Sequence, residues 1–239
     1  MKDVMILTGA GQIGMAIARR MGYGKKVVIG DKKKENAEKI SGIMKEAGFD
    51  TVAVEMDLSS RTSILNLIAE AQTYGPITML VNAAGVSPSQ SGHRMPALTP
   101  TEDEQLACTP TEELLQLEIL QPENIRDTLH AYQMAKRCNE KRVMAESVKW
   151  GEKGARLNSI SPGIIVTPLA LDEFHGPRGD FYKNMFAKCP AGRSGTADEV
   201  ANVAELLMSD KGAFITGSDF LVDGGATASY FYGPLKPEQ

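Results

Sequence analysis

A tyrosine and a lysine four positions apart, Tyr132 and Lys136, point most directly to chemistry in this chain of 239 residues. They lie in a helical pattern that runs from Ile125 to Trp150. Positions four apart share one face of a helix, so the phenol and the ammonium group are expected side by side. A neighbouring positive charge lowers the pKa of a tyrosine toward the range in which it exchanges a proton near neutral pH. Taken alone, however, such a pair is more often an amphipathic surface tyrosine and a solvated lysine.

A glycine-rich turn between a strand pattern and a helix pattern is the second chemical feature. Gly9 permits a tight turn, Gly11 lets the backbone approach a pyrophosphate, and Gly14 allows close packing of helix on strand. The N-terminus of the helix that follows would face the anion. We therefore expect the turn as a whole to bind a dinucleotide, through Gly9, Gly11, Gln12, Ile13 and Gly14. The alternative is a set of ordinary turn glycines.

An acidic residue, Asp31, lies 17 positions beyond Gly14, at the end of the next strand pattern. A carboxylate there can accept hydrogen bonds from the adenosine ribose and would repel a 2′-phosphate, which favours NAD over NADP. The three lysines 32–34 lie close enough to weaken this preference. Asp57 ends the third strand pattern and either contacts the edge of the adenine ring or caps a helix near Arg61. Both interpretations of Asp57 stay open.

The elements that must position these residues alternate between strand and helix. The sequence predicts three successive βα units, parallel strands and right-handed crossovers. We expect an α/β fold, a single Rossmann-type domain over residues 1–239 with a doubly wound parallel sheet and helices on both faces. Residues 82–122 read as surface loop apart from a short helical piece at Glu112–Leu120, and an insertion at about 86–124 is expected to form a substrate lid. Strands are predicted at Val4–Leu7, Lys26–Ile29, Thr51–Val54, Ile77–Val81, Ala155–Ile160 and Asp219–Val222, and further helices at Ile13–Met21, Lys34–Ala47, Arg61–Thr73 and Thr196–Met208.

The composition of the chain indicates which classes of binding partner to expect. A formal charge of −4 and a pI near 5.5 leave no basic surface for nucleic acid or an anionic membrane, so we expect a small-molecule substrate. The three cysteines are far apart and odd in number, which suits a reducing, cytoplasmic compartment. The first twenty residues form a strand, turn and helix rather than a signal peptide, and no apolar stretch is long enough to cross a bilayer. His93, His130 and His175 lack metal-ligand spacing, so no metal is expected.

Taken in order along the chain, these motifs resemble the signatures of short-chain dehydrogenases/reductases. The resemblance rests on the glycine-rich turn, Asn82-Ala83-Ala84-Gly85, Tyr132-Gln-Met-Ala-Lys136, Ser161-Pro162-Gly163 with Thr167, and Val222-Asp223-Gly224-Gly225. It covers nearly the whole chain. The segment from Trp150 to Asn158 and the long loop before Tyr132 further resemble the 3α-hydroxysteroid dehydrogenase/carbonyl reductase branch.

The resemblance implies a role for each matched residue. Tyr132 would exchange the proton of the substrate hydroxyl or carbonyl while NAD(H) moves the hydride, and Lys136 would also hold the nicotinamide ribose. Ser89 would hydrogen-bond the reacting oxygen, with Ser91 as runner-up. Further cofactor contacts are expected from Asn82, Ala83, Gly85, Pro162, Gly163, Ile165 and Thr167. A homo-oligomer, dimer or tetramer, is also expected.

Two departures from the family pattern stand out. The glycine-rich turn is one residue shorter than usual. Between Gly85 and Ser89 the family has a helix and a strand, with a catalytic asparagine on the helix, whereas only three residues stand here. Loss of a central strand would leave two rows of buried backbone groups unpaired, at about 1–3 kcal/mol each. We therefore expect that about 30 residues are missing around Val86–Gln90. The alternatives are that the neighbouring strands have closed up or that another segment fills the place of the strand.

The sequence thus favours an NAD(P)-dependent oxidoreductase that acts on a secondary alcohol or ketone, with steroid-like compounds among the candidate substrates. A catalytically impaired nucleotide-binding or regulatory module of the same fold is the alternative, because the helix that carries the asparagine is absent. An isomerase or epimerase with tightly held NAD is less favoured, because the chain lacks a large C-terminal substrate domain.

Overall fold

The structure, a computed structural model, describes residues 2–85 and 97–236. The chain divides into two compact units, which we describe separately. Unit 1 comprises residues 1–85, 165–176 and 195–212, and unit 2 comprises residues 86–164, 177–194 and 213–239. The expectation of a single domain over the whole chain stays a prediction.

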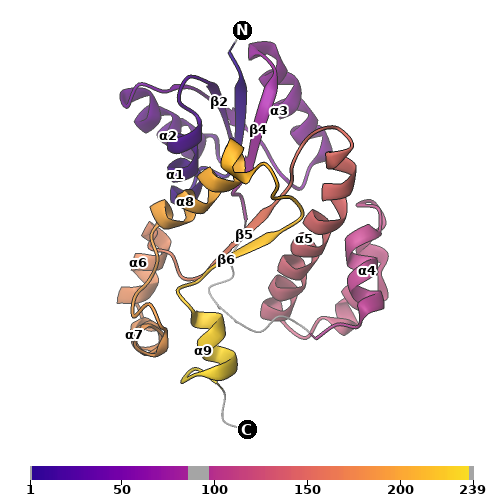
Figure 1. Cartoon of the computed structure of the whole chain (residues 1–239), viewed down its shortest axis with the longest axis vertical. Coiled ribbons are helices and arrows are strands. Elements are labelled where there is room, and N and C mark those ends of the chain that lie inside the picture. Colours follow the sequence, from indigo (N-terminus) through magenta and orange to yellow (C-terminus); the bar gives the residue numbers. More distant parts are fainter. Residues whose placement is uncertain (1, 86–96, 237–239) are drawn as a thin grey trace. The chain divides into compact units, whose positions relative to one another are not determined.

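Unit 1 is built around a four-stranded parallel sheet in the order β3-β2-β1-β4. The two middle strands are apolar on both faces and almost wholly buried, as expected for strands covered by helices on both sides. Helices α1 and α2 lie on one side of the sheet and α3 on the other (Figure 1). The strands are β1 (Val4–Thr8), β2 (Lys26–Asp31), β3 (Asp50–Glu55) and β4 (Ile77–Asn82).

The helices of unit 1 start where the sequence supplies caps. Ser60 caps α3, and the Thr196 hydroxyl and the Glu199 carboxylate form a capping box at the start of α8, as the sequence predicts. Helix α8 packs along α1, and Arg20 of α1 donates to the Glu205 carboxylate of α8 over 3.2 Å. The helices are α1 (Gln12–Met21), α2 (Lys34–Glu46), α3 (Arg61–Tyr74), α6 (Pro168–His175), α8 (Ala197–Met208) and the short η4 (Asp210–Gly212).

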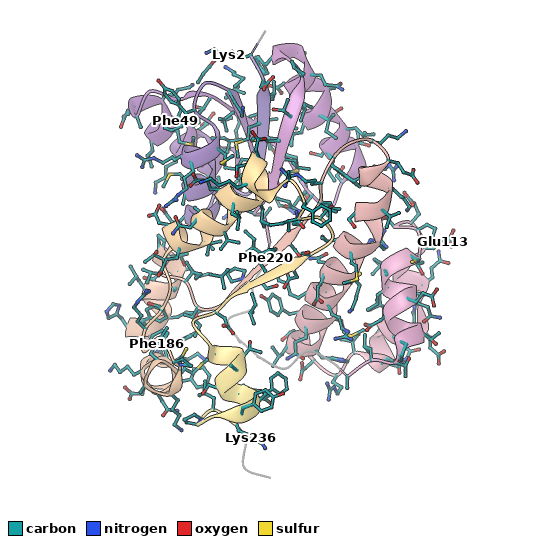
Figure 2. All side chains as sticks on the ribbon, in the orientation of Figure 1. Lys2, Phe49, Glu113, Phe186, Phe220 and Lys236 are labelled. Atoms are coloured by element: carbon teal, nitrogen blue, oxygen red, sulfur yellow. The ribbon has the colours of Figure 1, made fainter. Side chains whose placement is uncertain are left out.

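Unit 2 holds a two-stranded parallel sheet, β5 (Ser159–Pro162) with β6 (Asp219–Val222), and the long helix α5 (Thr128–Gly151). Helix α4 (Pro100–Cys108) packs beside α5 (Figure 1). In α7 (Gly179–Lys188) the buried Tyr182 lies next to Phe186, which Figure 2 labels, with ring centroids 6.4 Å apart. The other helices are η1 (Leu114–Gln116), η2 (Glu118–Leu120), η3 (Pro122–Asn124) and α9 (Ala226–Tyr232).

The segment predicted as surface loop is more ordered than expected. Helix α4 begins at a capping box in which Thr99 and Glu102 exchange hydrogen bonds. The predicted helical piece at Glu112–Leu120 forms two short 3₁₀ helices instead of an α-helix. Leu106 of α4 is fully buried against Met134 and Cys138 of α5, with Leu114, Leu117 and Ile125 packed around them. The described part of the insertion therefore shares a core with α5. Its action as a substrate lid stays a prediction.

In unit 1, β4 stands at one end of the sheet and pairs with β1 alone among the described strands of that unit. The outer edge of β4 has no strand partner there, and Leu80 on that strand is 51% exposed. The strand predicted at Ala155–Ile160 forms a few residues later, at Ser159–Pro162. The links around Val86–Gln90, where about 30 residues are expected to be missing, lie outside the described residues.

Candidate functional site

The glycine-rich turn joins β1 to α1 in unit 1, with geometry suited to an anion. Gly9 has φ +88°, and a Cβ on it would lie 2.5 Å from the backbone nitrogen of Ala84. A Cβ on Gly14 would lie 2.8 Å from the carbonyl oxygen of Gly9. In contrast, a Cβ on Gly11 would meet nothing within 4 Å. The turn is thus packed tightly on the protein side and is open at the position where a ligand would approach.

The start of α1 has unused hydrogen-bonding capacity. Gly11 caps this helix without a side-chain hydrogen bond, and the amide of Met15 makes the first helical bond back to it. The first amides of a helix, here those of Gln12, Ile13 and Gly14, have no partner within the helix. Their donors and the positive end of the helix dipole suit a pyrophosphate. These features fit the nicotinamide dinucleotide that the sequence implies.

Asp31 is half-buried at the carboxyl end of β2 and is held by the protein itself. Its Oδ2 accepts a hydrogen bond from the amide of Ala10, in the glycine-rich turn, over 2.9 Å. Its Oδ1 accepts from the amide of Lys33 over 2.9 Å and from the side-chain amide of Asn36 over 3.4 Å. The carboxylate therefore lies beside the turn, as predicted, but in contacts that the sequence did not indicate.

Asp57 follows β3 and forms an ion pair with Lys32, whose Nζ lies 2.9 Å from Oδ2 of Asp57. The hydroxyl and the amide of Ser59 both donate to Oδ1 of Asp57. These hydrogen bonds, together with Lys32, lower the pKa of Asp57 to about 2. Asp57 is therefore ionised throughout the neutral range, and the Lys32 ammonium lies beside a negative charge.

The end of β4 is tied to the end of β1. The hydroxyl of Thr8 donates to Oδ1 of Asn82 over 2.7 Å, and the amide of Ala83 donates to the carbonyl of Thr8 over 2.9 Å. Asn82 and Ala83 are exposed, as is Gly85. These three predicted cofactor residues thus lie at the edge of the sheet where the glycine-rich turn begins.

Ile165 and Thr167 belong to the same unit. Ile165 is 7% exposed and bridges to Gly195. The hydroxyl oxygen of Thr167 accepts from the amide of Ala170 at the start of α6, so its own O–H is left to donate. A donor at this position suits the carbonyl of a nicotinamide carboxamide.

Pro162 is the last residue of β5 in unit 2, and Gly163 follows it. The amide of Gly163 donates to the carbonyl of Val222 over 2.9 Å, and a Cβ on Gly163 would lie 2.7 Å from Cα of Asp223. Glycine is therefore required here because the two strand ends approach closely.

Tyr132 and Lys136 share one face of α5 in unit 2, as their spacing predicts. The Nζ of Lys136 lies over the Tyr132 ring, 5.3 Å from its centroid. Tyr132 is half-buried and Lys136 is exposed. Asp127 caps the helix by accepting from the amide of His130, so both residues lie in the first turns of a well-anchored helix.

The described site residues are divided between the two units. The turn, Asp31, Asp57, the Asn82–Gly85 segment, Ile165 and Thr167 belong to unit 1, while Tyr132, Lys136, Pro162 and Gly163 belong to unit 2. Ser89, with its runner-up Ser91, lies outside the described residues.

Sequence reasoning missed three participants, namely Thr8, Ala10 and Asn36. Thr8 is a buried polar residue at the end of an apolar strand, which is a signal that a side-chain partner exists. Asn36 lies in the first turn of a helix that follows a strand ending in aspartate, a place where an amide can reach back to the carboxylate. Ala10 acts through its amide alone, so its side chain gives no signal.

Two further features concern residues 2–85 and 97–236. No group of three or more His, Cys, Asp or Glu side chains there could hold a metal ion. No helix within residues 2–85 and 97–236 is long and apolar enough to cross a membrane.

The chain matches two sequence profiles that together cover most of its length. One describes short chain dehydrogenases and matches residues 3–106, and the other describes enoyl-(acyl carrier protein) reductases and matches residues 107–227. The chain therefore belongs to the short-chain dehydrogenase/reductase family. Members of this family are oxidoreductases that use a nicotinamide cofactor on CH–OH and C=O groups, and this chain is such an enzyme.

Two curated relatives are similar over almost their whole length. A short-chain dehydrogenase/reductase of Alternaria brassicicola is 32% identical, covering 95% of this chain and 96% of its own. A 2,5-dichloro-2,5-cyclohexadiene-1,4-diol dehydrogenase of Sphingobium indicum is 30% identical, covering 94% of this chain and 95% of its own. The alignment with the Alternaria relative extends over 265 positions but includes only about 227 residues of this chain, so about 38 positions of the relative have no counterpart here.

A solved structure, that of a variant actinorhodin polyketide ketoreductase with NADPH, shares the fold. Its TM-score is 0.71 at 22% identity, covering 95% of this chain and 97% of the other. The Rossmann-type α/β fold expected from the sequence is thereby confirmed. The narrower resemblance to the 3α-hydroxysteroid dehydrogenase/carbonyl reductase branch stays a prediction.

Proposed function

We propose that this chain is an NAD-dependent dehydrogenase or carbonyl reductase that interconverts a secondary alcohol and a ketone through Tyr132 and Lys136. The observation that carries the proposal is the placement of the Lys136 ammonium over the Tyr132 ring on one face of α5, in a chain of this family. An ammonium group beside a phenol stabilises the negative charge that develops on the phenol oxygen while its proton is being transferred.

The proposed mechanism assigns one task to each residue. A bound nicotinamide supplies the hydride in reduction and accepts it in oxidation. The Tyr132 hydroxyl donates a proton to the carbonyl oxygen in reduction and accepts the alcohol proton in the reverse direction. Lys136 stabilises the charge on the Tyr132 oxygen and hydrogen-bonds the nicotinamide ribose, while Ser89 orients the reacting oxygen.

The remaining residues hold the cofactor. The amides at the start of α1 bind the pyrophosphate, and the Thr167 hydroxyl donates to the carboxamide. Asn82, Ala83 and Gly85 would also contact the cofactor, as would Pro162 and Gly163 at the end of β5.

Preference for NAD over NADP is part of the proposal. Asp31 places a carboxylate beside the turn, where it would repel a 2′-phosphate. Two of the three nearby lysines lie beside carboxylates, since Lys32 pairs with Asp57 over 2.9 Å and Lys34 lies 3.8 Å from Glu38. Their attraction for a 2′-phosphate is correspondingly reduced.

The proposal also covers the cellular location and the oligomeric state of the enzyme. We place it in the cytoplasm as a homo-oligomer, either dimer or tetramer; its unpaired cysteines and its formal charge of −4 support the location. Light scattering after gel filtration, and cell fractionation, test these two statements.

Turnover with both cofactors tests the proposed function. Purified protein is titrated with NADH and NADPH, followed by assays on a panel of ketones and secondary alcohols that includes steroids. We expect tighter binding of NADH and measurable oxidation or reduction of at least one panel member. Cofactor binding without turnover on any member would favour a catalytically impaired nucleotide-binding module instead.

A further inference from the structure

Two hydrogen bonds hold the glycine-rich turn to the carboxyl end of β2. The amide of Gly9 donates to the carbonyl of Gly30 over 2.8 Å. The next amide, that of Ala10, donates to the side chain of Asp31 over 2.9 Å. The first of these bonds depends only on the backbone, whereas the second depends on the identity of residue 31.

Asp31 also connects the turn to the start of α2. While its Oδ2 holds Ala10, its Oδ1 accepts from the amide of Lys33, which caps α2, and from the side chain of Asn36 in the first turn of that helix. The side chain of Asp31 therefore links the glycine-rich turn to the start of α2. Hydrogen bonds to an ionised acceptor are stronger than those between neutral groups.

The position that this contact controls is the one that faces the ligand. Ala10 lies between Gly9, which packs against Ala84, and Gly11, beside which the structure has open space. Gly11 in turn caps α1. A shift of Ala10 would move the Gly11 backbone and the first amides of α1, which are the proposed pyrophosphate donors.

We propose that Asp31 is a positioning residue for the phosphate-binding turn, in addition to its proposed contact with the adenosine ribose. The inference rests on the proposed cofactor site. Both roles are compatible, because each carboxylate oxygen has two lone pairs and Oδ2 uses only one of them for Ala10. It follows that residue 31 contributes to binding even of a ligand that has no ribose hydroxyls.

The first test measures the contact in the free protein. Hydrogen exchange of the Ala10 amide, followed by NMR, is compared between the native chain, Asp31→Ala and Asp31→Asn. We expect exchange at Ala10 to accelerate at least about tenfold in Asp31→Ala, because the acceptor is lost. Asp31→Asn keeps one of the two acceptor oxygens and should restore part of the protection. Unchanged exchange in Asp31→Ala would overturn the inference, whether or not the protein binds NAD.

The second test separates positioning from ribose recognition. ADP and 2′,3′-dideoxy-ADP both carry a pyrophosphate, but only ADP has ribose hydroxyls, and their affinities are measured by calorimetry. If Asp31 positions the turn, Asp31→Ala weakens 2′,3′-dideoxy-ADP by about tenfold as well, and Asp31→Asn recovers part of the loss. Glu35→Gln, which removes an exposed charge in the first turn of α2, is the matched control and should leave both affinities unchanged.

Three outcomes count against the proposals in distinguishable ways. A loss confined to ADP would show that Asp31 acts only on the ribose, which overturns the positioning role but keeps the cofactor site. Equal losses in Asp31→Ala and Glu35→Gln would reduce the effect to net charge and also overturn it. No binding of either nucleotide or of NADH by the native chain would overturn the cofactor site and, with it, any role of Asp31 in positioning the turn for a ligand.

Discussion

At the scale of single residues, the proton chemistry proposed for this enzyme rests on one hydroxyl group. Tyr132→Phe removes that group and keeps the ring that lies beneath Lys136. We expect turnover to be abolished while NADH affinity stays within a few-fold, because the cofactor contacts remain. Lys136→Ala should weaken both binding and rate. Steady-state kinetics with fluorescence titration of NADH checks both variants, and turnover retained by Tyr132→Phe would exclude Tyr132 as the proton donor.

The open space beside Gly11 gives a second residue-scale prediction. A Cβ on Gly11 meets nothing within 4 Å, and its φ of −99° suits any residue, so Gly11→Ala should fold with an unchanged Tm. The added methyl would occupy space reserved for the pyrophosphate, and we expect NADH affinity to fall at least about tenfold. Gly9→Ala is the contrasting variant, because its Cβ would clash with Ala84 at φ +88° and lower the Tm itself. Equal NADH affinity in Gly11→Ala and the native chain would contradict a phosphate site at this turn.

Cofactor preference depends on what surrounds the lysines as well as on Asp31. Asp57→Asn removes the charge that pairs with Lys32. The freed ammonium should attract a 2′-phosphate, so the ratio of NADPH to NADH affinity is expected to rise a few-fold. Glu46→Gln makes the same charge change at the far end of α2 and should leave the ratio unaltered. The prediction fails if both variants change the ratio equally or if neither does.

At the scale of elements, period and capping signals predicted some segments well and others poorly. The βα units of unit 1 were predictable because each strand is a short apolar run and each helix has one buried face. Helix α8 was predictable from its capping box, yet the same signal at Thr99 and Glu102 was missed because polar residues dominate α4. Only Leu106 of that helix is buried, so it has no apolar stripe for a periodicity argument to find.

The candidate site was predictable to a similar extent. Glycines and spacing located the turn and the Tyr132–Lys136 pair, because both depend on residues close in sequence. The bond from Ala10 to Asp31 spans 21 positions and uses a backbone donor, so no residue type announces it. The ion pair between Lys32 and Asp57 joins the ends of two strands and was likewise visible only after folding.

The junction of α4 and α5 gives a prediction about pH. Arg137 donates to both carboxylate oxygens of Asp103 over 2.6 Å, and these hydrogen bonds hold the pKa of Asp103 below its usual value of 3.8. A carboxyl whose pKa is lowered by folding stabilises the protein above its unfolded pKa and loses that effect as the pH falls through its folded pKa. Asp103→Asn should therefore reduce the free energy of unfolding by about 1 kcal/mol at pH 7. The difference from the native chain should shrink progressively below pH 3.8.

Urea denaturation of both chains across this pH range measures the difference. Asp180→Asn in α7 is a suitable control. Asp180 is almost fully exposed, and its carboxylate pairs with Lys183 of the same helix. A difference for Asp103→Asn that does not vary with pH would mean that packing, and not the ion pair, accounts for the loss.

At the scale of the whole molecule, the main unexpected feature is the edge strand β4 of the four-stranded parallel sheet in unit 1. In the described part of the chain, β4 has no strand partner on its outer edge, and its residues from Ile77 to Asn82 carry no charge. Uncharged open edges invite association with other strands, and proteins usually block them with lysine, proline or a bulge. The register shift near Ile77 disturbs the beginning of this edge but leaves Met79 to Asn82 regularly paired with β1 on the other side. The sheet of β5 and β6 has only two strands in the described part of the chain, and an isolated two-stranded sheet is marginally stable.

These features lead to a prediction about the polypeptide as its natural source makes it. The unpaired edge of β4 and the three residues between Gly85 and Ser89 point to one further helix–strand unit after Gly85. The alignment with the Alternaria relative leaves about 38 positions of that relative unmatched, which is enough residues for such a unit. We expect the natural polypeptide to contain it, with about 30 additional residues.

Trypsin cuts after lysine and arginine, and the chain has neither between Thr62 and Arg94, so the junction falls in a single peptide of known mass. Mass spectrometry of the protein from its source should find that peptide replaced by a larger one or by several. Detection of the intact Thr62–Arg94 peptide at the mass of this sequence, as the predominant form, would show that no unit is missing. The chain would then have to satisfy the edge of β4 by closing its neighbouring strands together or by pairing with another segment.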